Sequence, residues 1–450
     1  MKLSELRKKR GLETYSMVGR SRGGLDERTY NSIKSQVHFS LVKKLDLSSV
    51  ADMPKEELSQ VIRQSLQDIA TREKLPLNQE ERAMLISDLL NEILGLGPIE
   101  PLMQDDSIQD ILVNGHSSVY VEREGVLEPT PIRFRDDEHL MQIIDKIVSS
   151  IGRRVDESSP MVDARLEDGS RVNVIIPPLA LDGPILSIRK FGQKALTIDD
   201  LISSNTLPAE IAAYLEAAVK SKLNILISGG TGAGKTTLLN ILAGYIPDNE
   251  RIITIEDSAE LRLQQPHVVR LESRPANVEG KGEVTLTDLV RNSLRMRPDR
   301  IIVGESRGAE VLDMLQAMNT GHPGSMSTIH ANSPRDALSR MEVMLSMGTS
   351  VFSEMAMKAL LGSAINIIVQ LARLPDGKRR LMSVSEVAGI SGEDFVLHEI
   401  FRFEQHGVDA NGNIYGCFKA TGKESMFMDH MKSHGIELKK EIFQLVWEVK

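Results

Sequence analysis

The 450-residue sequence contains one cysteine, Cys417, and this scarcity excludes an intrachain disulfide framework. No Cys/His cluster has the spacing of a zinc module. No uncharged apolar run has the length of a membrane span, and the N-terminus lacks the apolar core of a signal peptide. We therefore expect a cytoplasmic protein, and docking on a membrane protein stays open.

Positive charge and aromatic residues are also scarce. The chain has 54 Lys and Arg residues against 63 Asp and Glu residues, a formal net charge of −9, and 4% aromatic residues. General nucleic-acid binders carry basic patches, and single-strand binders interleave aromatic with basic side chains. Because neither feature is present, we expect no direct nucleic-acid partner. Hydrophobic residues make up 41%, as in ordinary globular proteins, and the length allows two or three domains.

The residue pattern changes along the chain and predicts five parts. Residues 1–25 are rich in Lys, Arg, Ser and Gly, which predicts a flexible tail. Apolar residues spaced by three and four predict a helical region over residues 26–100. Short strand patterns around one helix predict an α+β domain over 101–191, followed by a linker at 192–198. Residues 199–450 alternate strands and helices and end in an extension, with a hairpin at 395–419 and a final helix after Met428.

A glycine-rich segment stands between an apolar strand pattern and a helix pattern in this last part. Residues 229–236 match G-x-x-x-x-G-K-[ST], the loop that binds phosphate groups. Its glycines let backbone N–H groups converge on phosphate oxygens at a helix N-terminus. An ordinary glycine-rich turn does not explain a lysine beside a hydroxyl. The predicted ATP-binding residues are Gly230, Thr231, Gly232, Ala233, Gly234, Lys235, Thr236 and Thr237, with the Thr236 hydroxyl as a ligand of Mg²⁺.

Acidic and histidine side chains follow three later strand patterns. Glu256 and Asp257 follow residues 251–255, Glu305 follows 300–303, and His330 follows 325–329. Carboxyl ends of parallel strands meet at one edge of a sheet, so these residues predict one site. Glu305 is our candidate for the carboxylate that polarises water. Gly304 stands where phosphate-loop proteins often have an aspartate, so we expect Glu256 and Asp257 to help hold the metal.

Four motifs together resemble the ATPase superfamily of type II secretion, type IV secretion and type IV pili. They are the phosphate loop, the acidic box at 255–261, R-P-D-R-I-I-V-G-E-S-R at 297–307 and T-G-H-P-G-S-M-S-T-I-H at 320–330. D-E-S-S-P-M-V-D-A-R at 156–165 and I-I-P-P-L-A-L-D-G-P at 175–184 are similar to the CpaF (TadA) ATPases of Tad/Flp pilus systems. The resemblance covers about residues 95–373. The tetracysteine module of the type II branch is absent.

This resemblance implies an α/β fold with a RecA-like P-loop ATPase domain, preceded by a small α+β domain and an N-terminal helical region. It also implies a homohexamer that holds ATP between the two domains of a subunit, near a neighbouring subunit. Arg165, Arg171 and Arg189 would then contact the phosphates, with surface salt bridges as the alternative. His330 would couple the γ-phosphate to the subunit interface. For His322, the alternative to a functional role is a purely structural one. For Arg297 and Arg300, the alternative is an ion pair with Asp299.

Four functions fit these expectations. The first is a motor that powers pilus assembly, with possible retraction, through an inner-membrane platform protein, bound peripherally at the cytoplasmic face. The second is a type IV secretion traffic ATPase that moves protein or nucleoprotein substrates. A nucleotide switch with little turnover and a nucleic-acid motor are the other two, and the acidic balance counts against the last.

Overall fold

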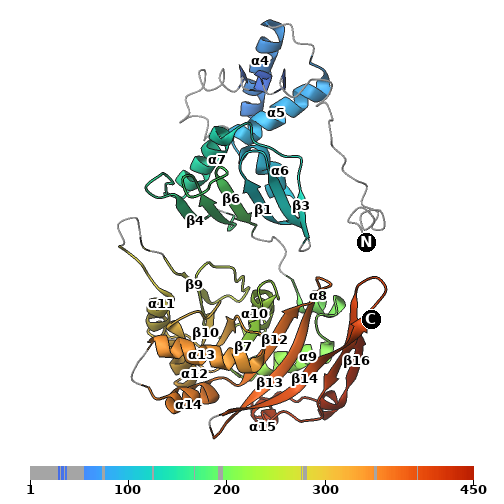
Figure 1. The fold of residues 1–450 in the computed structure, drawn as a ribbon. Helices are drawn as coiled ribbons and strands as arrows, with labels where there is room; N and C mark the ends of the chain where they lie inside the picture. The colour runs from blue at the N-terminus through green and yellow to red at the C-terminus, as the bar shows by residue number, and fades with distance from the viewer. Residues whose placement is uncertain are drawn as a thin grey trace. The chain divides into compact units, whose positions relative to one another are not determined.

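The computed structural model describes residues 29–30, 32–34, 36–37, 55–72, 77–123, 126–166, 168–190, 196–274, 276, 281–348, 352–392 and 394–449. The chain divides into two compact units, Met1–Gln193 and Lys194–Lys450 (Figure 1). The tail expected at 1–25 lies outside the described residues. So do residues 192–195 of the expected linker.

Helices open the described part of the first unit. They include α4 (Lys55–Arg72) and α5 (Gln79–Ile93), besides helical residues between 29 and 37. Apolar residues at helical spacing, among them Leu58, Ile62 and Leu85, are completely buried in one shared cluster. The first turn of α5 is fixed by a capping box between Asn78 and Glu81. The helical pattern of the sequence is thus found where the structure describes it.

Glu92, near the end of α5, ties these helices to the rest of the unit. Its carboxylate lies 2.6 Å from the Lys34 ammonium and 2.9 Å from Nε2 of His139. Lys146 donates to the carbonyls of Ile93 and Gly95, at 2.8 and 2.7 Å, where α5 ends. The helical region therefore belongs to the same compact unit as the α+β part.

An antiparallel sheet forms the remainder of this unit, in the order β3-β2-β1-β6-β5-β4. The strands are β1 (Ile108–Asn114), β2 (Val119–Arg123), β3 (Val126–Pro129), β4 (Met161–Arg165), β5 (Arg171–Ile175) and β6 (Ile185–Arg189). The short helices η1 (Gly97–Ile99) and α6 (Glu100–Gln104) precede it. Helix α7 (Asp137–Ser150) buries Leu140, Ile144 and Ile147 against the strands. One helix covering one face of a small sheet gives the expected α+β domain.

The second unit is built on a ten-stranded sheet in the order β16-β15-β14-β13-β12-β7-β11-β10-β8-β9. Its parallel strands are β7 (Ile225–Gly229), β8 (Ile252–Glu256), β9 (Val268–Glu272), β10 (Arg300–Val303), β11 (Met326–Ile329) and β12 (Ile367–Arg373). Side chains alternate across β7: Ile225 and Ile227 join one core cluster and Leu226 joins the other.

Helices pack on both faces of these parallel strands (Figure 1). Helices α9 (Ala209–Lys220) and α10 (Lys235–Ala243) pack with Ile225 and Ile227, and α8 (Ile198–Ser203) contributes Leu201 to the same cluster. Four helices pack with Leu226 on the other face: α11 (Leu286–Ser293), α12 (Glu310–Asn319), α13 (Pro334–Gly348) and α14 (Glu354–Ala364). A parallel sheet between two helix layers is the α/β fold that we expected.

Antiparallel strands extend this sheet beyond β12. They are β13 (Arg379–Ser391), β14 (Asp394–Val408), β15 (Ile414–Ala420) and β16 (Val446–Val449). The predicted hairpin is β14–β15. The final helix after Met428 was mostly wrong: α15 (Met428–Ser433) is short, and η2 (Lys440–Gln444) and β16 follow it. Gly435, with φ of 75°, takes the left-handed conformation that stops a helix.

Candidate active site

The phosphate loop connects β7 to α10, in the strand–loop–helix order that the motif requires. Gly232 and Gly234 have φ of 69° and 94°, a conformation that glycine adopts without strain. A Cβ on Gly229 would lie 2.6 Å from the carbonyl oxygen of Leu371 in β12. The loop glycines are therefore required by the backbone path and by this close strand contact.

The predicted phosphate-binding residues share this loop and the first turn of α10. Gly230, Thr231 and Gly232 are exposed, Gly234, Thr236 and Thr237 are half-buried, and Ala233 and Lys235 are buried. Exposed loop backbone at a helix N-terminus is a surface on which an anion can bind. The arrangement suits a polyphosphate group.

Strand pairing brings the other candidates to the same edge of the sheet. β11 lies between β7 and β10, and β8 pairs with the far side of β10, all in parallel. The strands thus end side by side, with the loop after β7, His330 after β11, Glu305 after β10 and Glu256 at the end of β8.

Lys235 is folded into the loop that it follows. Its ammonium donates to the carbonyl of Gly230 at 3.0 Å and lies 3.4 Å from both ring nitrogens of His330. Burial lowers the pKa of Lys235, although the nearby Glu305 carboxylate acts in the opposite direction. The loop lysine and the histidine predicted at a separate strand end are direct neighbours.

Glu305 is held from two sides. Its Oε1 lies 3.0 Å from Nε2 of His330, and its Oε2 accepts a hydrogen bond from Nη2 of Arg307 at 2.9 Å. Burial alone would raise the pKa of Glu305. The hydrogen bond and charge of Arg307, with His330 and Lys235, outweigh it and lower that pKa. The side chain is consequently an ionised carboxylate in a fixed orientation.

The same neighbourhood lowers the pKa of His330. Burial is the largest cause that lowers the pKa of this imidazole, and the Lys235 charge adds to it, while Glu305 opposes both. Arg340 of α13 donates to the His330 carbonyl at 3.0 Å and fixes the backbone there. A neutral ring beside the lysine can accept or donate a hydrogen bond without adding charge to the site.

Glu256 occupies the space beside Gly304. A Cβ at position 304 would lie 2.8 Å from Cγ of Glu256, so a larger residue there would displace this side chain. Oε2 of Glu256 accepts hydrogen bonds from the backbone N–H groups of Glu260 and Leu261 at 2.7 and 3.0 Å. Gly304 thus stands in place of an aspartate because the neighbouring strand supplies a carboxylate in that space.

The two acidic residues predicted to bind Mg²⁺ differ in how their carboxylate oxygens are hydrogen-bonded. Among the described residues, the buried Oε1 of Glu256 has no hydrogen-bond partner, and burial raises the pKa of this carboxyl. Asp257 is exposed, lies 3.1 Å from Nη1 of Arg307 and accepts from the Ser273 hydroxyl at 3.1 Å. Carboxylate and hydroxyl oxygens are the donors that Mg²⁺ prefers, so Glu256, Asp257 and Thr236 fit this ion chemically.

The three predicted arginines form one row in the first unit. Arg165 of β4 pairs with Arg171 of β5, which pairs with Arg189 of β6. Nε of Arg165 donates to the Gly169 carbonyl at 3.2 Å, and Arg189 lies 3.2 Å from Asp110 of β1. The register therefore places the three arginines at paired positions of neighbouring strands.

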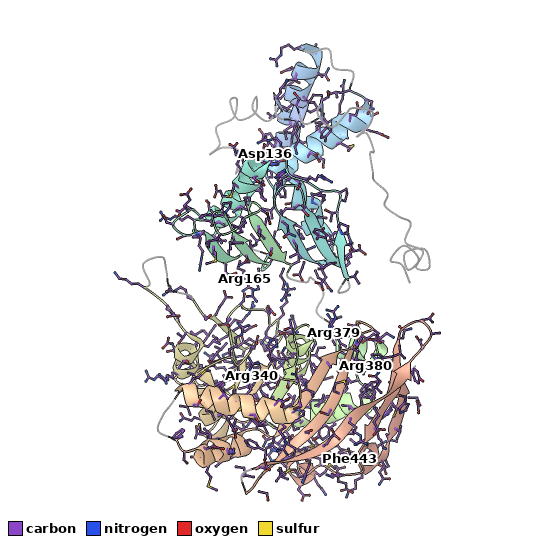
Figure 2. All side chains as sticks on the ribbon, in the orientation of Figure 1. Asp136, Arg165, Arg340, Arg379, Arg380 and Phe443 are labelled. Atoms are coloured by element: carbon purple, nitrogen blue, oxygen red, sulfur yellow. The ribbon has the colours of Figure 1, made fainter. Side chains whose placement is uncertain are left out.

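Arg379 is a site residue that the sequence analysis missed. It begins β13, and its Nε donates to the carbonyl of Gly232 in the phosphate loop at 3.0 Å (labelled in Figure 2). Arg373, its partner on β12, lies near the same glycine: a Cβ on Gly232 would be 3.7 Å from Nη1 of Arg373. The turn Pro375-Asp376-Gly377 between them is a hairpin signal that could have located the two strands.

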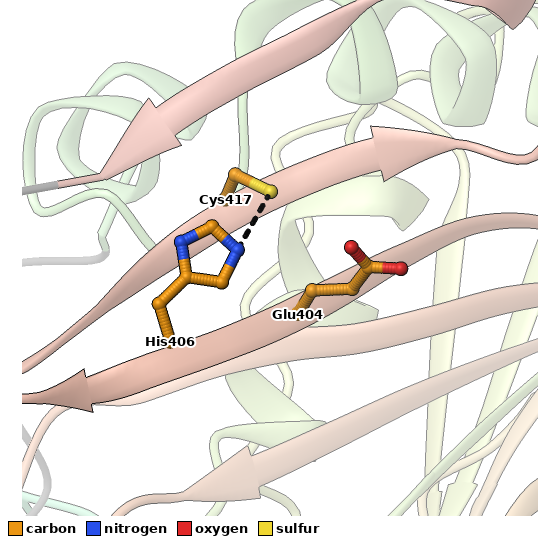
Figure 3. Close-up of side chains that lie close together, drawn as sticks. All are labelled: Glu404, His406 and Cys417. Atoms are coloured by element: carbon orange, nitrogen blue, oxygen red, sulfur yellow. Dashed lines mark hydrogen bonds between the residues drawn. The ribbon is translucent and has the colours of Figure 1, made fainter.

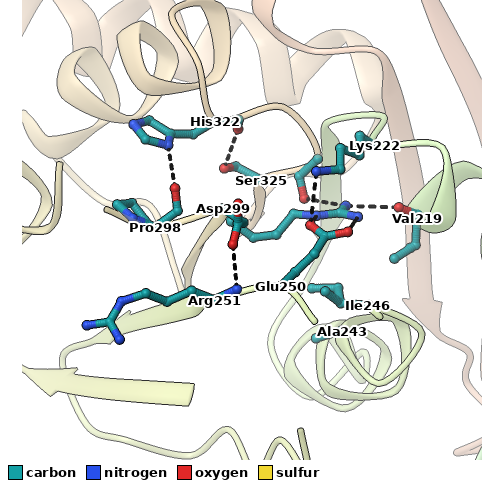
Figure 4. A network of polar contacts seen from close by, with 12 residues as sticks. Val219, Lys222, Ala243, Ile246, Glu250, Arg251, Pro298, Asp299, His322 and Ser325 are labelled. Atoms are coloured by element: carbon teal, nitrogen blue, oxygen red, sulfur yellow. Dashed lines mark hydrogen bonds and ion pairs between the residues drawn. The ribbon is translucent and has the colours of Figure 1, made fainter. Parts of the chain in front are cut away.

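The remaining motif residues have structural partners. The Arg300 guanidinium is completely buried, binds both carboxylate oxygens of Glu250 at 2.7 and 3.1 Å, and donates to the Val219 and Gly324 carbonyls. Asp299, the alternative partner of Arg300, instead accepts from the Arg251 backbone N–H at 2.7 Å (Figure 4). His322 lies 2.9 Å from the Pro298 carbonyl through Nδ1, which agrees with the structural alternative.

Known proteins are similar to this chain over most of its length. The family model described as "Type II/IV secretion system protein" matches residues 92–419. A putative conjugal transfer protein of Mycobacterium tuberculosis is 39% identical over 310 residues, which are 68% of this chain and 88% of that protein. The type IV secretion system protein VirB11 of Bartonella quintana is 30% identical over 328 residues, which are 64% of this chain and 91% of that protein.

Among solved structures, the VirB11 ATPase of the Brucella suis type IV secretion system is 27% identical. That comparison covers 64% of this chain and 95% of the other, with a TM-score of 0.35. Within the described helices, none has the combination of length and apolar character that a membrane span needs. The family model spans most of the sequence, and the identities extend over both units. The chain therefore belongs to the family of type II/IV secretion system proteins.

Proposed function

We propose that this chain is an ATPase that binds ATP with Mg²⁺ and converts hydrolysis to ADP and phosphate into mechanical work. The observation that carries the proposal is the sequence of contacts from Lys235 to His330 to Glu305, at 3.4 and 3.0 Å. A phosphate-loop lysine marks where the terminal phosphates bind. An ionised carboxylate one histidine away is suitably positioned to orient the water that attacks them.

Each residue has one role in the proposed reaction. Backbone N–H groups of the loop and the Lys235 ammonium bind the phosphates. Thr236, Glu256 and Asp257 would hold Mg²⁺, which would neutralise phosphate charge during transfer. Glu305 orients the water, and Arg307 and His330 fix that carboxylate. Arg379 fixes the loop through the Gly232 carbonyl.

We also propose that Arg165, Arg171 and Arg189 contact the phosphates in the assembled enzyme, a homohexamer. Support comes from the register of β4, β5 and β6, which places the three arginines at paired positions of neighbouring strands. Binding of a nucleotide by charged groups from two units would couple ATP to a rigid-body movement of one unit against the other. That movement is the proposed mechanical output.

The proposed task of the motor is assembly, with possible retraction, of a Tad/Flp type IV pilus through inner-membrane platform proteins, at the cytoplasmic face of that membrane. The segments at 156–165 and 175–184 support this CpaF-like assignment. The second candidate is a type IV secretion traffic ATPase. It is favoured by the conjugal-transfer and VirB11 names of the relatives.

A strain from which the gene for this protein is deleted tests which of the two tasks the protein performs. Loss of surface pili that wild-type protein restores, and Glu305→Gln protein does not, supports the pilus motor. Normal pili together with loss of conjugal transfer or of secreted protein would assign the traffic ATPase instead. A Glu399→Gln allele, which changes a surface carboxylate in an ion pair with Arg402, is the control and should restore the wild-type phenotype.

A further inference from the structure

Away from the phosphate loop, a cysteine, a histidine and a glutamate meet on the antiparallel part of the sheet. Glu404 of β14 pairs directly with Cys417 of β15, so both side chains lie on the same face. The ladder is irregular between Gln405 and Gly407, which leaves His406 without a paired residue on β15. Such a bulge redirects a side chain, and Figure 3 shows the His406 ring turned toward Cys417.

We infer that Glu404, His406 and Cys417 form a binding site for a thiophilic divalent cation of the Zn²⁺ class. One donor atom from each residue lies within 4.8 Å of the other two. Sγ of Cys417 and Nε2 of His406 are 3.6 Å apart. A tetrahedral Zn²⁺ ion with its usual bond lengths places sulfur and nitrogen ligands about 3.6 Å apart. The two strands therefore hold this pair at the separation that a shared ion needs.

The carboxylate of Glu404 is oriented by contacts to one of its two oxygens. Arg402 donates to its Oε1 at 2.7 Å, and the Lys419 ammonium lies 3.8 Å from the same atom. In the described part of the chain these contacts all involve Oε1, so Oε2 is the oxygen that would bind a cation. Metal-binding carboxylates are commonly oriented by a second hydrogen bond of this kind.

Cys417 is 4% exposed. On its other side it pairs with Glu448 of β16, which adds negative charge near the sulfur. A cation that binds here displaces the thiol proton to solvent, and a water completes the coordination with the three protein ligands. The ion would join β14 to β15 and stabilise this hairpin in proportion to its binding.

The spacing rules used on the sequence did not indicate this site. Cys417 and His406 are on consecutive strands of a long hairpin, and only the register brings their donor atoms together. The site is separate from ATP hydrolysis as proposed above, since none of its residues belongs to the phosphate loop or to the strand ends around it.

Titration of untagged full-length protein with Co²⁺ alone tests the inference. Because the chain has one cysteine, any thiolate-to-metal absorption reports on Cys417. We expect near-ultraviolet charge-transfer and visible tetrahedral bands that Zn²⁺ removes by competition. His406→Ala should weaken binding by at least about tenfold, Cys417→Ser should abolish the charge-transfer band, and both should keep the far-ultraviolet circular dichroism of wild type.

His398→Ala is the matched control, because His398 is on the same strand and outside the group. It should bind Co²⁺ as wild type does. No thiolate band in wild type, or a band of unchanged affinity in folded His406→Ala protein, would overturn the inference.

Discussion

The side chain of Glu256 leaves room only for a glycine, Gly304, at position 304, because a Cβ there would lie 2.8 Å from Cγ of Glu256. Glu256 cannot easily move away, since its Oε2 accepts hydrogen bonds from two backbone N–H groups. The glycine that makes this acidic motif unusual is thus explained by the carboxylate of the adjacent strand.

Gly304→Ala should consequently lower ATP turnover by displacing Glu256. Overpacking of a buried site typically costs about 1–3 kcal/mol of folding free energy, so we expect a lower melting temperature together with the slower hydrolysis. Gly308→Ala is the control, because its Cβ would meet only the end of the Glu310 side chain, at 3.3 Å. The steady-state rate of ATP hydrolysis, measured for both variants, tests this prediction. Unchanged turnover in Gly304→Ala would show that Glu256 is not needed.

Arg379→Ala should raise the KM for ATP more than it lowers kcat, because the phosphate loop loses the donor on Gly232. A hydrogen bond from a charged group contributes about 1.5–3 kcal/mol, which corresponds to roughly a tenfold or larger effect. Arg335→Ala removes an exposed arginine that lies 3.2 Å from Asp394 and should leave KM unchanged. An equal KM in both variants would contradict this role.

Arg165→Ala and Arg171→Ala should each depress turnover and leave the oligomer intact, as expected if the row contacts phosphates. Hydrolysis is measured beside size-exclusion chromatography of the same samples. Arg154→Ala, which removes an exposed partner of Asp156, is the control from the same unit. Normal turnover in both row variants would mean that these arginines do not reach the nucleotide.

Stability of the first unit should depend on pH through Glu92. Burial alone would raise its pKa, but the hydrogen bond from His139 and the charge of Lys34 lower it from 4.5 to about 2. The unfolded state therefore binds the proton first as pH falls. This contribution to stability is complete above pH 4.5 and is lost as the pH falls toward 2.

The shift corresponds to about 3 kcal/mol of unfolding free energy. Urea unfolding of the full chain, followed by circular dichroism from pH 7 to 3, measures it. The difference between wild type and Glu92→Gln should shrink as pH falls, while Glu138→Gln, at an exposed position of α7, should follow wild type. A constant difference between wild type and Glu92→Gln would contradict the assignment.

The sequence predicted the parts of the site that depend on adjacent residues. The phosphate loop, β10 and the residues that follow β8, β10 and β11 were located because each is a continuous segment with its own pattern. Parallel pairing, which the strand–helix alternation implied, then accounts for their meeting at one edge.

Long-range pairing explains what was missed. The short run Ile367–Arg373 cannot be told from a buried helix by its periodicity alone, and β12 and its partner β13 were not predicted. Arg379 meets Gly232 only because β12 pairs with β7. Pairing with Asp299 was the alternative role of Arg300, but successive residues in an extended chain point in opposite directions. The partner of Arg300 is Glu250, which precedes the adjacent strand β8.

The central claim is that Glu305 orients the attacking water while Lys235 binds phosphate. ATP affinity and single-turnover hydrolysis, measured on the same preparations of wild type, Glu305→Gln and Lys235→Ala, test it most directly. Glu305→Gln should bind ATP with near-wild-type affinity and hydrolyse it at least about a hundredfold more slowly, and Lys235→Ala should lose turnover by a similar factor. Hydrolysis by Glu305→Gln within about twofold of wild type, or a loss of ATP binding together with hydrolysis, would contradict the role given to Glu305.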